Sequence, residues 1–135
     1  MSEYNRLNHC KFLIQYHIIW CPKFRFNVLK GNVESELKQI LWIISTQYEF
    51  EIKEIEIMPD HIHLFISTKP TIAPTVVVRI LKGISARELF KKFPKLKEFY
   101  NRSGSLWSKG YFASTVGKVS EETVKRYIQE QKTRS

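Results

Sequence analysis

The stretch EIKEIEIMPDHIHLFIS, residues 51–67, limits most strongly what this chain can fold into. Residues 51–57 and residues 61–67 are both rich in β-branched and aromatic residues, which is typical of strands. Only the residues MPD separate them, and proline followed by aspartate favours a turn. The stretch therefore predicts an antiparallel hairpin, and any fold for this chain must contain it.

One helix is predicted before this hairpin and one after it. Apolar residues recur at helical spacing over residues 32–48, with Asn32 as the candidate N-cap. A second such stripe runs from Pro74, which suits the first turn of a helix, to about Phe93. Residues 94–105 are expected to form a loop.

Two further strands and a last helix complete the pattern. Residues 11–21 and 106–116 have the composition of strands, and Ser120 is a candidate cap for a C-terminal helix. The order β-α-β-β-α-β predicts an α+β fold, the ferredoxin-like (RRM-like) split βαβ antiparallel sheet with an added C-terminal helix. No linker or repeat interrupts residues 1–135, so we expect a single domain.

The charge of the chain points to a polyanionic partner. The net charge is +9, and the last 57 residues, with 14 Lys and Arg against 5 Asp and Glu, carry an excess equal to the whole. A basic half of this kind favours nucleic acid. No apolar run could span a bilayer and no signal peptide is visible, so we expect a cytoplasmic protein without a membrane partner. Two cysteines without CxxC spacing predict neither a disulfide framework nor a zinc site.

His61 and His63 stand one residue apart in the second hairpin strand, so both side chains point to the same face. They lie roughly 7 Å apart along the strand, close enough for both imidazoles to bind one ion. Two protein ligands leave coordination positions open for substrate oxygens, as a catalytic metal requires. Exposed strand histidines without an ion are the alternative interpretation.

The last helix offers a third ligand and a nucleophile. Tyr127 and Gln131 are spaced i, i+4 and share one helical face. Gln131 can supply an amide oxygen to a metal, and Tyr127 a phenol that attacks a polarised electrophile. Taken singly, each residue fits an ordinary amphipathic helix equally well.

Together these residues resemble the single-tyrosine HUH transposases, small enzymes of prokaryotic insertion sequences that move as single-stranded DNA. The name describes the motif of two histidines around a hydrophobic residue. The resemblance runs from about residue 10 to about residue 132. The segments that carry it, in their order, are YHIIWCPKFR (16–25), MPDHIHLFIS (58–67), LKGISARELF (81–90), LWSKGYFASTVG (106–117) and YIQEQ (127–131).

The resemblance implies a role for each chemical residue. His61, His63 and Gln131 would bind Mg²⁺ or Mn²⁺, and Asp60 would shape the turn or orient His61. Tyr127 would attack the scissile phosphate, leaving a 5′-phosphotyrosine and a 3′-hydroxyl that later rejoins. The family also implies a homodimer with active sites shared between subunits, for which Gly117 is a plausible hinge.

The resemblance also implies that the basic half binds a DNA hairpin at the element ends. Phosphate contacts are expected from Arg79, Lys82, Arg87, Lys91 and Lys92, and also from Lys95 and Lys97. Aromatic residues of this half are expected mostly in the core, with stacking on unpaired bases as the alternative for Phe90, Phe93, Trp107 or Tyr111.

Three other functions remain open from the sequence. A non-catalytic ferredoxin-like nucleic-acid-binding module would share the fold order and the charge, but would not need His61, His63, Tyr127 and Gln131 together. A replication or mobilisation nickase of the HUH class would ordinarily be a longer chain. A metal-dependent hydrolase that uses water would leave no covalent adduct. His17, in the first strand, is interpreted as structural.

Overall fold

Four strands form one antiparallel sheet in the order β2-β3-β1-β4. The computed structural model of the chain describes residues 14–116 and residue 129. The order of elements is the split βαβ order, so the α+β, ferredoxin-like prediction is confirmed. The elements are β1 (Ile14–Trp20), the 3-10 helix η1 (Lys23–Arg25), α2 (Asn32–Tyr48), β2 (Glu51–Met58), β3 (His61–Thr68), α3 (Pro74–Lys92), α4 (Pro94–Phe99) and β4 (Phe112–Thr115).

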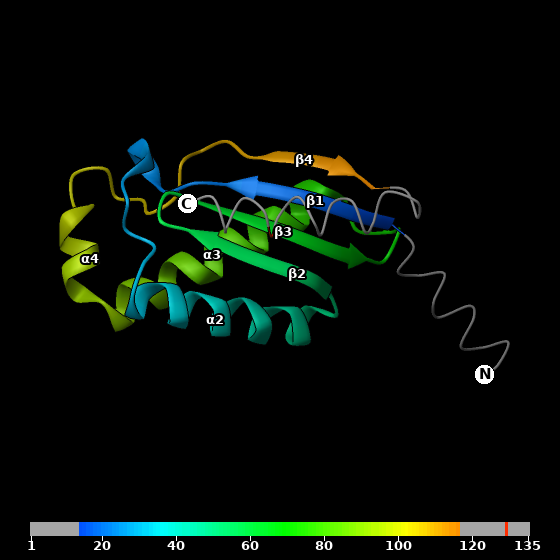
Figure 1. Cartoon of the computed structure of the whole chain (residues 1–135), viewed down its shortest axis with the longest axis horizontal. Coiled ribbons are helices and arrows are strands. Elements are labelled where there is room, and N and C mark those ends of the chain that lie inside the picture. Colours follow the sequence, from blue (N-terminus) through cyan, green and yellow to red (C-terminus); the bar gives the residue numbers. More distant parts are fainter. Residues whose placement is uncertain (1–13, 117–128, 130–135) are drawn as a thin grey trace, which may run out of the picture.

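The sheet has two chemically different faces. Helices α2 and α3 lie side by side across one face (Figure 1), and the inward residues of β1 and β3 fill the core beneath them, among them Ile18, Leu64 and Ile66, all fully buried. On the other face, Ile19 pairs with His63 and His17 pairs with Phe65. The predicted hairpin thus forms with the predicted alternation, and β3 places its histidines opposite the helices.

Helix α2 forms where the apolar stripe predicted it. Its buried residues recur every three or four positions: Leu37, Ile40, Leu41 and Ile44. The cap differs from the prediction, because Gly31 rather than Asn32 is the N-cap. Gly31 adopts a φ of 63°, which glycine reaches without a steric penalty, and its carbonyl accepts a hydrogen bond from the Ser35 N–H. No helix in the described ranges is long and apolar enough to cross a membrane.

The segment after α3 is partly helical, although we expected a loop over residues 94–105. Helix α3 ends at Lys92 because a residue that precedes proline, here Phe93, disfavours helical geometry. Pro94 then occupies the first turn of α4, where its missing N–H costs nothing. Leu96 and Tyr100 are buried four residues apart, and this single pair anchors the short helix. Because the neighbouring residues are mostly polar, two apolar positions alone did not predict a helix in the sequence.

The last strand is shorter than predicted, because β4 covers only Phe112–Thr115 of the expected 106–116. The preceding residues make only an isolated antiparallel bridge, between Trp107 and Pro22, and also bind α3. Trp107 is buried, and its indole N–H lies within hydrogen-bond distance of the Lys82 carbonyl (3.0 Å) and the Ser85 hydroxyl (3.1 Å). The Lys82 ammonium donates to the carbonyls of residues 108–110. These contacts hold residues 108–110 as a loop on α3 between the bridge and β4.

Two adjacent isoleucines of α2 test the packing of the core. Ile44 is 1% exposed and Ile43 is 56% exposed. We expect Ile44→Ala to lower the free energy of unfolding by about 2–5 kcal/mol, because it leaves a cavity under the sheet. Ile43→Ala should change it by less than about 0.5 kcal/mol. Urea denaturation measures both, and equal losses would contradict the assigned faces of α2.

Candidate functional site

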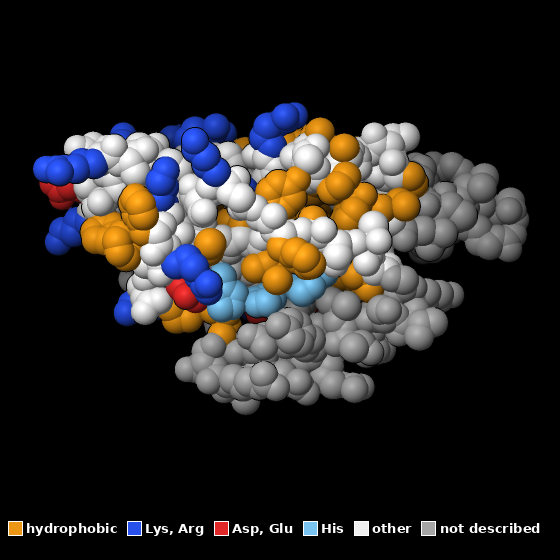
Figure 2. Space-filling view, turned by 90° about the horizontal axis from the view of Figure 1, so that it is seen from above, with side chains coloured by type: hydrophobic (Ala, Val, Ile, Leu, Met, Phe, Trp, Pro, Cys, Tyr) orange, Lys and Arg blue, Asp and Glu red, His pale blue; other side chains and the backbone are white. Residues whose placement is uncertain are grey.

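His61 and His63 lie next to each other on the face of the sheet opposite α2 and α3. Their rings meet edge to face, with centroids 4.8 Å apart. His63 is 3% exposed, whereas His61 is partly exposed. Histidine side chains line up on the face seen in Figure 2, beside a basic and an acidic side chain. The pair that the sequence singled out is therefore brought together.

Asp60 holds the first histidine through the turn that joins β2 and β3. Its Oδ1 lies 2.7 Å from Nδ1 of His61, and its Oδ2 accepts a hydrogen bond from Nη2 of Arg25 at 3.1 Å. An ionised carboxylate only accepts hydrogen bonds, so Nδ1 of His61 carries the proton. The lone pair of His61 is then on Nε2. The contact is the one that an orienting role for Asp60 requires.

His17 holds the second histidine, a contact that the sequence did not reveal. Nε2 of His17 lies 3.3 Å from Nδ1 of His63, and the two rings are stacked. His17 belongs to β1 and is 46 residues away in the chain. Its partner follows only from the register of β1 on β3, although strand alternation could have placed both residues on one face. Because Nδ1 is occupied, a ligand of His63 must approach Nε2.

Burial keeps the second histidine neutral. Burial, followed by the charges of His61 and His17, lowers the pKa of His63 to about 4. Burial also lowers the pKa of His17. For Asp60, burial acts to raise the pKa, but the hydrogen bond to His61 and the charge of Arg25 outweigh it and the pKa is lowered. A neutral imidazole is the form that binds a metal.

The donor set suits a metal that needs ligands from more than one segment. His61 and His63 each have Nδ1 in a hydrogen bond, which is the usual arrangement of histidines that bind a metal through Nε2. No group of three His, Cys, Asp or Glu side chains that could hold an ion occurs in residues 14–116 or at 129. A further protein ligand would have to be of another type or come from the remaining residues. The arrangement of His61 and His63 is compatible with two of the three protein ligands of the expected metal.

A cleft of about 530 Å³ opens beside the histidines. Its walls come from the end of β1, the loop 108–111 and the start of β4. The residues lining it are Ile19, Trp20, Cys21, Arg25, His61, His63, Ser108, Gly110, Tyr111 and Phe112. The guanidinium of Arg25 brings a positive charge to this cleft, which suits an anionic ligand.

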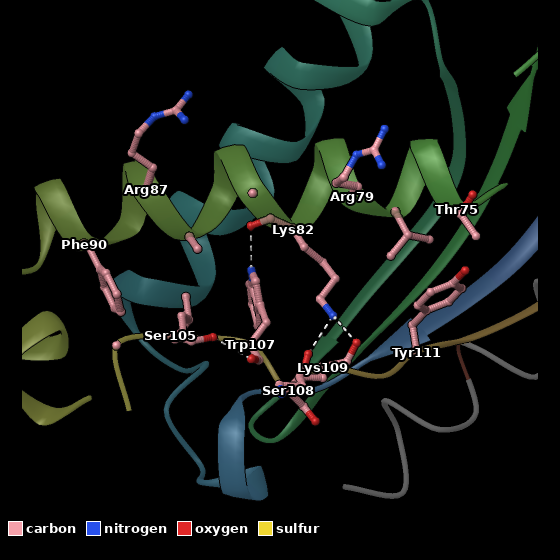
Figure 3. Close-up of a pocket in the computed structure, with 15 residues that line it drawn as sticks. Thr75, Arg79, Lys82, Arg87, Phe90, Ser105, Trp107, Ser108, Lys109 and Tyr111 are labelled. Atoms are coloured by element: carbon pink, nitrogen blue, oxygen red, sulfur yellow. Dashed lines mark hydrogen bonds between the residues drawn. The ribbon is translucent and has the colours of Figure 1, made fainter. Parts of the chain in front are cut away.

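A second hollow of about 530 Å³ lies between α3 and the loop 104–111 (Figure 3). Tyr111 and Ser108 line both this hollow and the cleft of the histidines, so the two adjoin. In Figure 3, Lys82 reaches from α3 toward the loop, whereas Arg79 and Arg87 extend away from it. Trp107 packs in the core rather than presenting its ring, as expected for most of these aromatic residues.

The basic residues predicted to bind DNA fall into three groups. The Lys82 ammonium is held by the carbonyls of residues 108–110, the nearest at 2.6 Å, and burial lowers its pKa. Lys91 and Lys92 form loose ion pairs with Glu88 and Glu36, both at 3.6 Å. Arg79 and Arg87 are exposed and make no ion pair with the described residues. Lys95 and Lys97, on α4, belong to the same group, since they are exposed and make no ion pair with the described residues.

The predicted nucleophile and third ligand lie outside the described residues. This applies to Tyr127, Gln131 and the hinge residue Gly117. Gln129, which lies between the first two in sequence, is described as helical, and its Nε2 donates to Oε2 of Glu54 at 2.9 Å. Glu54 pairs with Phe65, on the same face as His63. This contact brings Gln129 to the face that carries the histidines.

Acid should destabilise the metal-free protein through the buried histidine. The pKa of His63 is lowered from 6.5 to about 4, so between these pH values the unfolded chain binds a proton that the folded protein does not. We expect the free energy of unfolding to fall as the pH drops from about 6.5 to about 4, by urea denaturation in EDTA. His63→Phe should flatten this dependence, and an unchanged slope would contradict a neutral, buried His63.

Comparison with known proteins assigns the family. The model of the family described as "Transposase IS200 like" matches residues 10–131. The ISDra2 transposase TnpA of Deinococcus radiodurans is 41% identical over 120 residues, which cover 89% of this chain and 85% of the relative. The transposase for insertion sequence element IS200 of Salmonella typhimurium is 30% identical over 135 residues, covering 98% and 88%.

Solved structures agree with this assignment. A Deinococcus radiodurans protein, whose crystal structure is described as that of a transposase, superposes with a TM-score of 0.71 at 38% identity, over 87% of this chain and 89% of that one. A REP-associated tyrosine transposase bound to a REP hairpin shares the fold, with a TM-score of 0.66 at 13% identity over 91% and 68%. The resemblance noted in the sequence is thus confirmed: the chain belongs to the IS200-like transposase family.

Proposed function

We propose that this chain cleaves and rejoins single-stranded DNA at the ends of an insertion sequence, with Tyr127 as the nucleophile. The observation that carries the proposal is the pair His61 and His63, whose Nδ1 atoms are both held by neighbouring side chains. Held in this way, each ring offers Nε2 to a shared ligand beside a cleft that suits an anion. Membership of a transposase family gives this site its substrate, DNA.

The metal of the proposed site is Mg²⁺ or Mn²⁺, bound by His61, His63 and Gln131. Such an ion, when bound, polarises the scissile phosphate and stabilises the charge that develops on it. The protein fixes the geometry of the ligands. Asp60 keeps the proton of His61 on Nδ1, and His17 fixes the ring of His63.

Tyr127 carries out the covalent chemistry in this proposal. Its phenol oxygen forms a bond to phosphorus, and the bond from phosphorus to the 3′ oxygen of the preceding nucleotide breaks. The 3′ oxygen takes up a proton and leaves as a 3′-hydroxyl, while the following DNA stays attached as a 5′-phosphotyrosine. A 3′-hydroxyl of another DNA end then attacks the phosphotyrosine, so the strand is rejoined without ATP. The contact of Gln129 with Glu54 supports an approach of this segment to the histidines.

The proposed DNA partner includes a hairpin near the element ends. The REP-associated relative is a transposase bound to such a hairpin. In this chain, Arg79 and Arg87 offer exposed cations along α3, next to a hollow that adjoins the cleft. A homodimer with active sites shared between subunits completes the proposal, and Gly117 is the hinge about which the Tyr127 helix docks on the histidines of either subunit.

A covalent-trapping assay tests the nucleophile. The protein is incubated with Mn²⁺ and labelled single-stranded DNA that carries the element end, and the products are separated on a denaturing gel. We expect a protein–DNA adduct that is absent in EDTA and absent in Tyr127→Phe, because phenylalanine lacks the attacking oxygen. His63→Ala should abolish it as well. Tyr48→Phe, on α2, is the matched control and should form the adduct at the wild-type level.

Three outcomes of this assay would contradict the proposal. An adduct that persists in Tyr127→Phe would remove this residue as the nucleophile. Binding of the DNA without any adduct would favour a nucleic-acid-binding module, and cleavage without an adduct would favour a hydrolase that uses water.

The contact between His17 and His63 predicts a loss of metal affinity on substitution. His17→Phe removes the partner of Nδ1 of His63 and leaves this ring less well oriented. We expect Mn²⁺ to bind about 10- to 100-fold more weakly, by isothermal titration calorimetry. His17→Gln, which keeps a hydrogen-bonding group, should retain more affinity than His17→Phe. Equal affinity of wild type and His17→Phe, with both folded by circular dichroism, would assign His17 to packing alone.

A further inference from the structure

Three aromatic side chains are exposed together, two from the segment around η1 and one from α4. Helix α4 lies at one end of the molecule in Figure 1. Phe24 is 68% exposed, Phe99 57% and Phe26 43%. Phe26 lies between the other two, with ring centroids 5.6 Å from Phe24 and 5.2 Å from Phe99. The buried ring of Tyr100 lies against Phe26 and Phe99. We call Phe24, Phe26 and Phe99 the aromatic ledge.

The backbone that presents the ledge is strained. Phe24 and Arg25 have φ values of 64° and 52°, in the left-handed region that bulky L-residues rarely adopt. Hydrogen bonds hold the turn in place: the Lys23 N–H donates to the Leu106 carbonyl (2.7 Å), the Arg25 N–H to the Pro22 carbonyl (2.8 Å), and the Tyr100 hydroxyl to the Lys23 carbonyl (3.1 Å). Strain that turns a phenylalanine outward does not serve the core, and points to a binding role.

The ledge is joined to the candidate active site through the turn that carries Phe24 and Arg25. Arg25, the residue after Phe24, lines the cleft of the histidines. It also forms the ion pair with Asp60, the residue that orients His61. The ring of Phe24 and the guanidinium of Arg25 are thus carried by neighbouring residues of one turn, Arg25 at the cleft and Phe24 at the hollow of the ledge.

The surroundings of the ledge have the chemistry of a site for unpaired bases. A hollow of about 380 Å³ is lined by the three rings and by Glu98, Tyr100, Asn101, Arg102 and Ser103. The side chains of Glu98, Asn101 and Arg102 bring polar groups that suit base edges. The Lys23 ammonium lies 5.9 Å from the centroid of Phe24. Exposed lysines, Lys95 and Lys97, lie on the adjoining helix α4. Aromatic faces among cations are typical of proteins that bind single-stranded nucleic acid.

We propose that the aromatic ledge binds unpaired bases of the DNA strand next to the scissile phosphate. Bases of a duplex are stacked within it and do not present their faces, so the ledge would select single-stranded DNA. The sequence-independent contacts are stacking and attraction of the backbone to the nearby cations. The proposal rests on the proposed function for the nature of its ligand and deepens it.

Binding without cleavage tests the ledge. The full chain is titrated into fluorescently labelled single-stranded oligothymidine in EDTA, and anisotropy gives the dissociation constant. We expect Phe24→Ala and Phe99→Ala to weaken binding by roughly 5- to 150-fold, the range for the loss of one stacked base. Trp42→Ala, which removes a 44%-exposed ring from α2, is the matched control and should bind as the wild type does. Phe24→Trp should retain affinity, because tryptophan also stacks.

An oligomer of the same length made of abasic sites separates stacking from charge. It keeps the phosphates but has no bases, so wild type and Phe24→Ala should bind it equally. Equal affinity of wild type and both alanine variants for oligothymidine would overturn the proposal. So would the same weakening on the abasic oligomer, or a shift of oligomeric state in Phe24→Ala and Phe99→Ala with DNA binding unchanged, which would make the ledge a protein contact.

The assay distinguishes this proposal from the proposed function. It requires neither a metal nor Tyr127, so failure to form an adduct leaves the ledge result unaffected. Thermal denaturation of each variant confirms that it is folded, which is expected because the substituted rings of Phe24 and Phe99 are largely in solvent.

Discussion

The pairing of β1 with β3 at the centre of the sheet is the constraint on which the rest of the structure depends. On one face it places Ile18 and Leu64 under the helices, and on the other it places His17 beside His63. Side chains alternate along a strand, so a register shift of one residue would move the histidines into the core and the core residues to the surface. The hydrophobic effect that fixes the register thus also fixes the distance between the imidazoles. Stability and site geometry have the same physical origin.

Burial of the histidines has opposite consequences for binding and for stability. It lowers the pKa of His63 to about 4, so this imidazole is neutral at physiological pH and has a lone pair for a ligand. The same burial destabilises the fold in acid, because His63 binds a proton in the unfolded chain at pH values where it stays neutral in the folded protein. The position of His61 differs, because it is partly exposed and bound to the carboxylate of Asp60. The ring of His63 is therefore fixed mainly by burial, and the ring of His61 mainly by its hydrogen bond to the Asp60 carboxylate.

Local pattern was sufficient to predict the hairpin, the stripes of α2 and α3 and the shared face of His61 and His63, because each depends on residues close in sequence. It was insufficient for contacts between distant segments. His17 is 46 residues from His63, and Arg25 is 35 residues from Asp60, so neither partner has a signature in its own stretch. Helix α4 was missed because only Leu96 and Tyr100 anchor it, and β4 was predicted too long because Trp107 and the carbonyls that follow bind α3. No local pattern marked Phe24, because its positive φ is a property of the folded backbone.

The loop 104–111 explains why a count of basic residues is a poor guide to a DNA surface. Lys82 was predicted to bind DNA together with Arg79 and Arg87. Its ammonium instead donates hydrogen bonds to the carbonyls of residues 108–110. Its charge fixes a loop that carries Ser108 and Tyr111, and these two residues border both the hollow along α3 and the cleft of the histidines. A partly buried ammonium that donates hydrogen bonds to several carbonyls is held in one position, whereas an exposed ammonium in solvent is not. Lys82 thus acts on DNA, in our proposal, by positioning the wall shared by the two hollows, and the exposed arginines supply the direct attraction.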